Sequence, residues 1–115
     1  MAISRQAAQA YESASQFRTQ RDREADIFRR ATAALKAARD TGTIARIRAL
    51  ADNRRLWLTI NDLMRDPSNT MPLQMRAQIV SVGLTVQREM DQDTPDFEFL
   101  IDINENFVAG LSGQP

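Results

Sequence analysis

Residues 43–65 read TIARIRALADNRRLWLTINDLMR, and their apolar residues recur at the spacing of an α-helix. One apolar stripe runs along the whole segment and comprises Ile44, Ile47, Leu50, Ala51, Trp57, Leu58, Asn61 and Met64. A second stripe joins it toward the C-terminal end and comprises Leu56, Ile60 and Leu63. Such a helix is about 33 Å long at about 1.5 Å per residue, enough to cross a small domain. The other segments are therefore expected to pack along it.

Helical signals also extend over the rest of the chain. No Pro occurs before Pro67, only four Gly are present, and no alternating run of β-branched and aromatic residues predicts a strand. Apolar periodicity predicts helices over about 3–15, 19–40, 43–65 and 73–90, and a last helix from about 95 to 111. The sequence therefore predicts an all-α fold, a single-domain helical bundle of about five helices, four long and one short.

The predicted helix 73–90 is apolar around most of its circumference. One face carries Met75, Ile79, Val82, Gly83, Val86 and Met90, and Val80 and Leu84 lie beside it. Helices of this kind are usually surrounded by others, so we expect this one to be central in the bundle. Gly83 disfavours a helix interior, which indicates a close helix crossing at this position.

The two ends of the chain are less well defined. Only the polar run 16–20 indicates a break between the first two predicted helices. The helix 3–15 has a narrow, Ala-dominated stripe that buries little area, which leaves open whether it docks loosely or stands free. We expect the whole chain, 1–115, to form one domain with a flexible tail over 112–115.

Composition limits the possible chemistry. The chain contains no Cys and no His, which excludes disulfides, thiolate nucleophiles, His-based triads and zinc sites of the usual kind. The carboxylates of Asp22, Glu24 and Asp26 stand two residues apart, so a helix spreads them instead of gathering them. We therefore expect no enzyme activity, no catalytic residues, no cofactor, no metal and no small-molecule substrate.

Charge and hydropathy bear on location and partners. Residues 1–6 meet a charge too early for a secretory signal, and no stretch approaches the roughly 18 to 20 apolar residues of a membrane span. We expect a cytoplasmic protein without membrane contact. Residues 1–55 hold twelve basic and six acidic groups, whereas residues 56–115 hold three basic and nine acidic ones. We expect the two halves to neutralise each other across the fold, which disfavours direct nucleic-acid binding.

Candidate partner-binding residues lie in two places. The run 53–57, NRRLW, puts Trp57 two residues after the pair Arg54-Arg55; Trp57 is either a core anchor or part of a partner groove, since Trp and Arg concentrate binding energy. Arg76 either pairs with Asp62 or Asp66 or binds a carboxylate of a partner. Four methionines, Met64, Met71, Met75 and Met90, lie around the same region and either suit a varied apolar partner or fill the core. Asn53, Asn61 and Asn104 lie near apolar stripes and are expected to bridge neighbouring helices.

Several of these segments resemble the FlaF family of flagellar biosynthesis regulators from alphaproteobacteria. The resemblance rests on Ala10-Tyr11, on residues 23–28 (READIF), on 53–57 (NRRLW), on Pro72 with Arg76-Ala77-Gln78-Ile79-Val80-Ser81, and on 100–104 (LIDIN) followed by Gly110-Leu111. It covers about residues 7–111.

The resemblance implies a non-enzymatic cytoplasmic protein that binds flagellin as a secretion chaperone, works with the translational regulator FlbT and helps to couple flagellin synthesis to export. The alternative is a post-transcriptional regulator that acts with FlbT through RNA or protein contacts. For the chaperone, we expect a partner groove around the helices 43–65 and 73–90. Its tentative partner-binding residues are Trp57, Met64 and Ile79 on the apolar side, and Arg54, Arg55 and Arg76 on the polar side.

Overall fold

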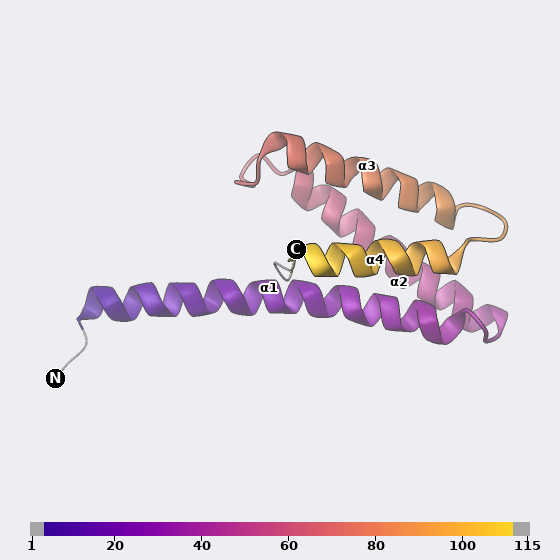
Figure 1. Ribbon diagram of the computed structural model, residues 1–115, viewed down its shortest axis with the longest axis horizontal. Coiled ribbons are helices and arrows are strands. Elements are labelled where there is room, and N and C mark those ends of the chain that lie inside the picture. The colour runs from indigo at the N-terminus through magenta and orange to yellow at the C-terminus, as the bar shows by residue number, and fades with distance from the viewer. Residues whose placement is uncertain (1–3, 112–115) are drawn as a thin grey trace.

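The computed structural model describes the backbone of residues 4–111 and, within it, the side chains of residues 4–12, 23 and 25–110. This part of the chain forms α1 (Arg5–Ala38), α2 (Thr43–Arg65), α3 (Leu73–Met90) and α4 (Phe97–Leu111), and it contains no strand (Figure 1). The predicted all-α helical bundle is confirmed. None of the described helices is long and apolar enough to cross a membrane. The expected tail, 112–115, lies outside the described residues.

The predicted break at residues 16–20 is absent, and α1 is one helix of 34 residues. The physical reason is that this run contains no Gly or Pro, and once a helix has begun, each further residue adds a hydrogen bond at little cost. Ser4 caps the N-terminus, where its hydroxyl oxygen accepts the backbone N–H of Ala7 at 3.1 Å. Residues 5–12 are all exposed. This end of α1 extends past the other helices (Figure 1).

The core lies where the C-terminal half of α1, the long helix α2 and α4 meet. Phe28 of α1, Trp57 of α2 and Phe107 of α4 form an aromatic cluster with ring centroids 4.8–5.9 Å apart. Leu35 and Leu100 are fully buried beside it. Through these contacts, α1 and α4 pack against the same stretch of α2.

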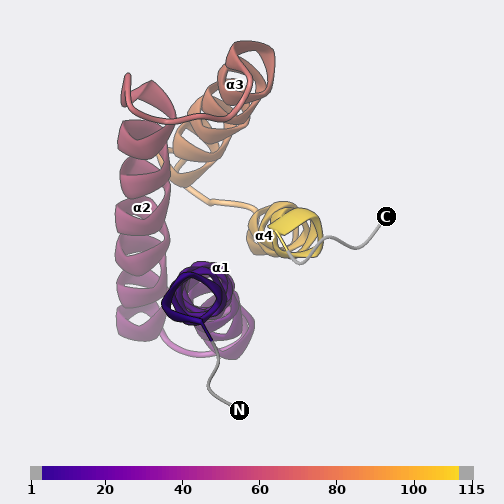
Figure 2. The same ribbon diagram turned by 90° about the vertical axis from the view of Figure 1, so that its left-hand side faces the viewer.

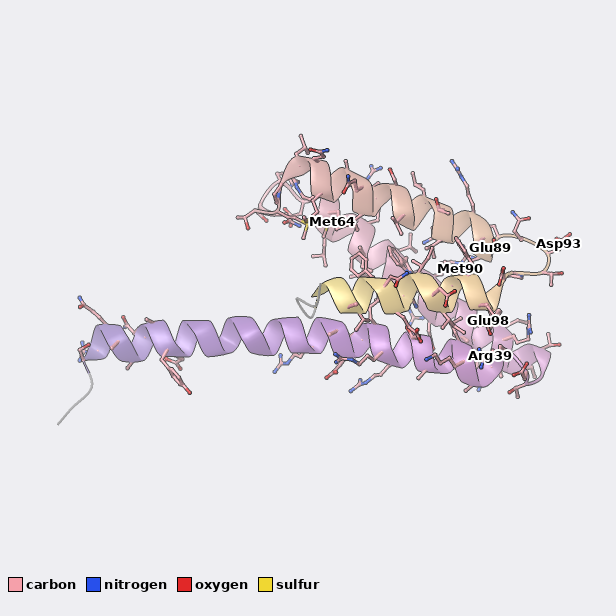
Figure 3. All side chains as sticks on the ribbon, viewed as in Figure 1. Arg39, Met64, Glu89, Met90, Asp93 and Glu98 are labelled. Carbon is pink, nitrogen blue, oxygen red and sulfur yellow. The ribbon has the colours of Figure 1, made fainter. Side chains whose placement is uncertain are left out.

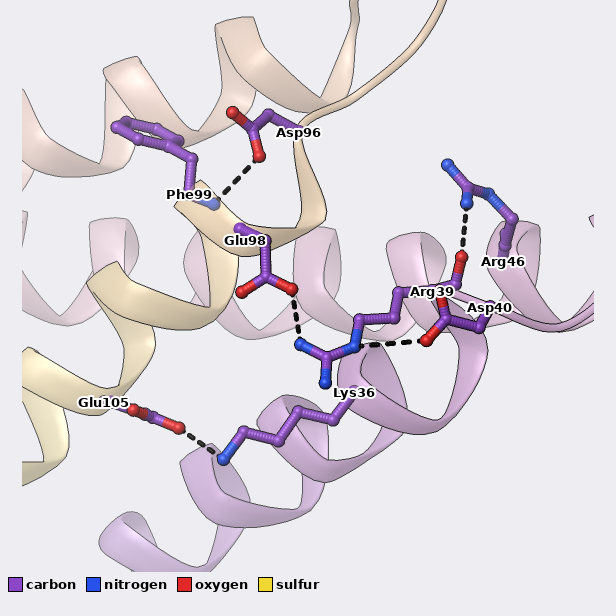
Figure 4. Close-up of polar contacts among 8 residues, drawn as sticks. All are labelled: Lys36, Arg39, Asp40, Arg46, Asp96, Glu98, Phe99 and Glu105. Carbon is purple, nitrogen blue, oxygen red and sulfur yellow. Dashed lines mark hydrogen bonds and ion pairs between the residues drawn. The ribbon is translucent and has the colours of Figure 1, made fainter.

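Ion pairs between α1 and α4 agree with the expected neutralisation of the two halves. Lys36 pairs with Glu105 and Arg39 pairs with Glu98 (Figure 4). Arg46 on α2 donates a hydrogen bond to the carbonyl of Arg39 at 2.7 Å. All four charged partners are more than one third exposed, so each pair contributes little to stability.

A buried amide network joins α2, α3 and α4. The indole N–H of Trp57 donates to the side-chain oxygen of Asn104 at 3.0 Å, and the Asn104 amide donates to that of Asn53 at 2.7 Å. The Asn53 amide in turn lies 3.4 Å from the sulfur of Met90. Both Asn residues are fully buried, and these bonds confirm that they bridge neighbouring helices. Asn61 is half-buried and makes no such bond among the described residues.

We predict that Asn104→Ala lowers the free energy of unfolding by about 2 kcal/mol, because it leaves two buried polar groups without a partner. The double variant Asn53→Ala/Asn104→Ala should cost less than the sum of the two single variants, since the second change removes one of the stranded groups. Urea denaturation followed by circular dichroism measures these values. Strictly additive losses would contradict the network.

The helix α3 is peripheral, not central as its composition predicted. It packs along α2 and makes no comparable interface with α1 or α4 among the described residues. Figure 2 shows α3 at the edge of the molecule, beside the end of α2 that lies away from α1. The close crossing expected at Gly83 is confirmed, because a Cβ there would lie 3.4 Å from the Trp57 ring. Among the described residues, only α2 therefore packs along α3, although α3 is apolar on several sides.

Candidate partner-binding surface

The hollow between α1 and α4 offers little chemistry. It has a volume of about 270 Å³ and is lined by Arg29, Thr32, Ala33, Lys36, Glu105 and Val108. Of its three charged residues, Lys36 and Glu105 pair with each other and Arg29 pairs with Asp26. No group of three or more acidic side chains among the described residues is arranged to hold a metal ion. The exposed surface of α3 is the stronger candidate for a functional site.

Large apolar side chains remain exposed on both flanks of α3. The exposed fractions are 73% for Leu73, 50% for Met75, 37% for Val82 and 49% for Leu84. Between Leu73 and Met90 the helix has only three charged residues, Arg76, Arg88 and Glu89. Because apolar area in water is unfavourable, these exposed side chains make α3 the candidate for a partner-binding surface.

One flank of α3, here called the inner side, faces α4. It comprises Met75, Ile79, Val82, Val86 and Glu89, which recur at steps of three and four residues. Glu89 accepts the backbone N–H of Asp96, just before α4, at 3.0 Å. Met64 at the end of α2 lies on this side as well, and both Met64 and Glu89 lie between α3 and α4 in Figure 3.

The other flank, here called the outer side, faces away from α4. It comprises Leu73, Ala77, Val80, Leu84 and Gln87, again at steps of three and four residues. The Gln87 side chain accepts a hydrogen bond from Arg54 of α2 at 3.1 Å. Arg54 also pairs with Asp91 at 2.8 Å. The two helices run antiparallel, so Leu58, which follows Trp57, and Leu84, which follows Gly83, lie on the same outer side.

The structure separates the six predicted site residues. Met64 and Ile79 lie together on the inner side, half-buried against the core. Trp57 is only 1% exposed, with its N–H already bonded, so it anchors the core below this surface. Arg54 joins α2 to α3 on the outer side, and Arg55 is exposed on α2.

Arg76 has a structural role that differs from the predicted ion pair with Asp62 or Asp66. Its guanidinium donates to the carbonyl of Met71 at 3.0 Å and to that of Met64 at 3.4 Å. A positive charge at the C-terminal end of α2 is favourable because the last carbonyls carry partial negative charge. Arg76 thus joins the start of α3 to the loop 66–72 and to the end of α2.

The same loop contains a carboxyl group, that of Asp66, whose pKa is shifted. Ser68 donates its backbone N–H and its hydroxyl to Asp66 at 2.9 and 2.8 Å. These two hydrogen bonds stabilise the carboxylate and lower the pKa of Asp66 below its usual value. The loop before α3 is therefore ordered by local hydrogen bonds.

Sequence reasoning missed Val82 as a surface residue and left open whether Met75 fills the core or contacts a partner. Their signal was present, because α3 is apolar on several sides and carries few charges. It was interpreted as evidence for a central helix, whereas only the packing shows which flanks stay open.

Comparison with known proteins gives one match. The family model described as flagellar protein FlaF matches residues 7–111, nearly the whole chain. No curated protein and no solved structure matches the chain.

Proposed function

Since the chain belongs to the FlaF family of flagellar proteins, we propose that it is a cytoplasmic flagellin chaperone that covers an amphipathic helix of flagellin before export. The observation that supports this role most directly is the exposure of Met75 and Val82 on the inner side of α3. A helix with apolar residues at Met75, Ile79 and Val82 presents the spacing that a second amphipathic helix requires. The bound flagellin helix would bury the apolar side chains of α3 that are exposed in the free chain.

The chemistry of the inner side suits a releasable complex. Met64 and Met75 have flexible side chains that adapt to different apolar partners. A flagellin segment that folds only on binding loses conformational entropy, which offsets part of the contact energy. The bound segment is thus kept from aggregation and can still be handed to the export machinery.

Gel filtration coupled to light scattering tests this proposal directly. The purified chain is mixed with its cognate flagellin in low and moderate salt, and we expect a stable complex in both. Apolar contacts depend weakly on salt, whereas contacts to nucleic acid weaken steeply because they release counterions. Absence of a complex, with the protein folded by circular dichroism, would contradict the chaperone. Binding to flagellin messenger RNA that disappears in moderate salt would favour the regulator that acts with FlbT.

A further inference from the structure

A second surface lies on α2, on the face opposite its buried residues. Ile44, Ile47 and Leu58 are 68%, 59% and 51% exposed, and Ala51 between them is exposed as well. These four residues follow one another at steps of three, four and seven, so they form one stripe along the helix, here called the α2 stripe. The side chains of Asn53, Leu56 and Ile60 point to the other side, into the core.

Two arginines border the α2 stripe along one edge. Arg48 and Arg55 are both exposed and stand seven residues apart, which places them about 10.5 Å from each other along the helix. Neither forms an ion pair with another residue that the structure describes, although Asp52 lies within one turn of both. Asp62 stands near the C-terminal end of the stripe.

Other arginines of this region are engaged within the fold. Arg39 pairs with Glu98, and Arg54 pairs with Asp91. Arg46 donates to the Arg39 carbonyl and lies over the ring of Phe97, 4.4 Å from its centroid. The unengaged guanidinium groups of Arg48 and Arg55 are therefore concentrated beside an exposed apolar stripe.

We propose that the α2 stripe with Arg48 and Arg55 is a second docking surface, and that its occupant is an amphipathic protein helix with acidic residues beside its apolar stripe. The charge pattern selects this partner, because guanidinium groups bind carboxylates through two parallel hydrogen bonds. Carboxylates two turns apart on a partner helix match the spacing of Arg48 and Arg55. Arg at the border of an apolar contact is also a residue type that concentrates binding energy.

This surface is separate from the one proposed for flagellin. The inner side, with Met75 and Val82, faces α4, whereas the α2 stripe continues toward Leu84 on the outer side of the α2–α3 pair. The two surfaces leave room for two partners at once. The chain would then connect the protein that it covers to a second, acidic partner.

A matched pair of synthetic peptides tests the proposal. Each forms a helix of about 15 residues or more with one leucine stripe, and carries either glutamates or lysines seven residues apart beside it. Each is titrated into ¹⁵N-labelled protein and followed by amide chemical shifts. We expect the glutamate peptide to shift residues 44–58 and to bind at least about tenfold more tightly than the lysine peptide.

The charge-reversed variant Arg48→Glu/Arg55→Glu should invert this preference. Both side chains are exposed, so the variant should keep the circular dichroism spectrum of the parent. Equal binding of the two peptides, no binding, or shifts confined to Met75 and Val82 would overturn the proposal. So would self-association of the chain that is abolished by Ile47→Glu, because the stripe would then bind a second copy.

Flagellin binding separates this inference from the proposed function. The single variant Arg48→Glu should weaken the preference for the glutamate peptide and bind flagellin as the parent does, since Arg48 lies neither on the inner side nor among the residues assigned to the flagellin groove. Loss of flagellin binding in this variant would overturn the separation of the two surfaces. Loss of the preference for the glutamate peptide, with flagellin binding intact, would be consistent with the proposed chaperone function and would support the second surface.

Discussion

Replacement of Trp57 by Ala is expected to lower the free energy of unfolding by about 3–5 kcal/mol, the range found for large aromatic side chains in protein cores. Trp57 is 1% exposed and contacts rings on both α1 and α4. The change also removes the donor to Asn104 and empties the space beside Gly83. A loss of this size is a large share of the total stability of a small domain.

Urea denaturation followed by circular dichroism measures this effect. The matched control is Leu58→Ala, one residue along the chain but 51% exposed, which should cost less than about 1 kcal/mol. The comparison separates core burial from helix propensity, because both variants place Ala in the same turn of α2. A loss for Trp57→Ala no greater than that for Leu58→Ala would show that Trp57 does not anchor the core.

The variant Met75→Glu/Val82→Glu is expected to weaken flagellin binding by at least about a hundredfold. Two carboxylates on the inner side would have to lose their hydration against an apolar partner, and each such burial costs several kcal/mol. Both side chains are more than one third exposed in the free chain, so folding should be affected much less than binding. Isothermal titration calorimetry with purified flagellin measures the change in affinity.

The control for this variant lies on the same helix. Leu73→Glu/Leu84→Glu introduces the same two charges on the outer side, where exposure is 73% and 49%. It should bind flagellin with an affinity close to that of the parent. Equal losses in both variants would show that the flagellin site is not confined to the inner side, and no loss in either would place the site outside α3.

The sequence predicts those features of the fold that depend on residues close together in the chain. The helices 43–65 and 73–90 were expected with the bounds that the structure has, because apolar periodicity and the Pro-containing loop between them act within a few residues. The continuity of α1 was missed because a polar run such as 16–20 only weakens a helix, whereas Gly or Pro would end it. The buried Asn bridges were expected because an amide among apolar residues requires a partner.

The six predicted site residues do not share one surface. Met64 and Ile79 were assigned to a partner groove and do lie on one side of the α2–α3 pair. Arg55 and Trp57 were assigned to the same groove, but residues two apart on a helix point about 200° apart. The structure therefore places Trp57 in the core and leaves Arg55 exposed on α2.

By itself, the sequence determined the fold class, the lengths of α2 and α3 and the need for partners at the buried amides, because these depend on neighbours along the chain. Only the tertiary structure decided which apolar face of α3 packs against α2 and which arginines are engaged. The physical reason is that α3 is apolar on several sides, so any of them would satisfy its hydrophobicity. The choice comes from contacts across the chain, such as Trp57 against Gly83 and Asn53 against Asn104, which position α2 and leave α3 at the edge.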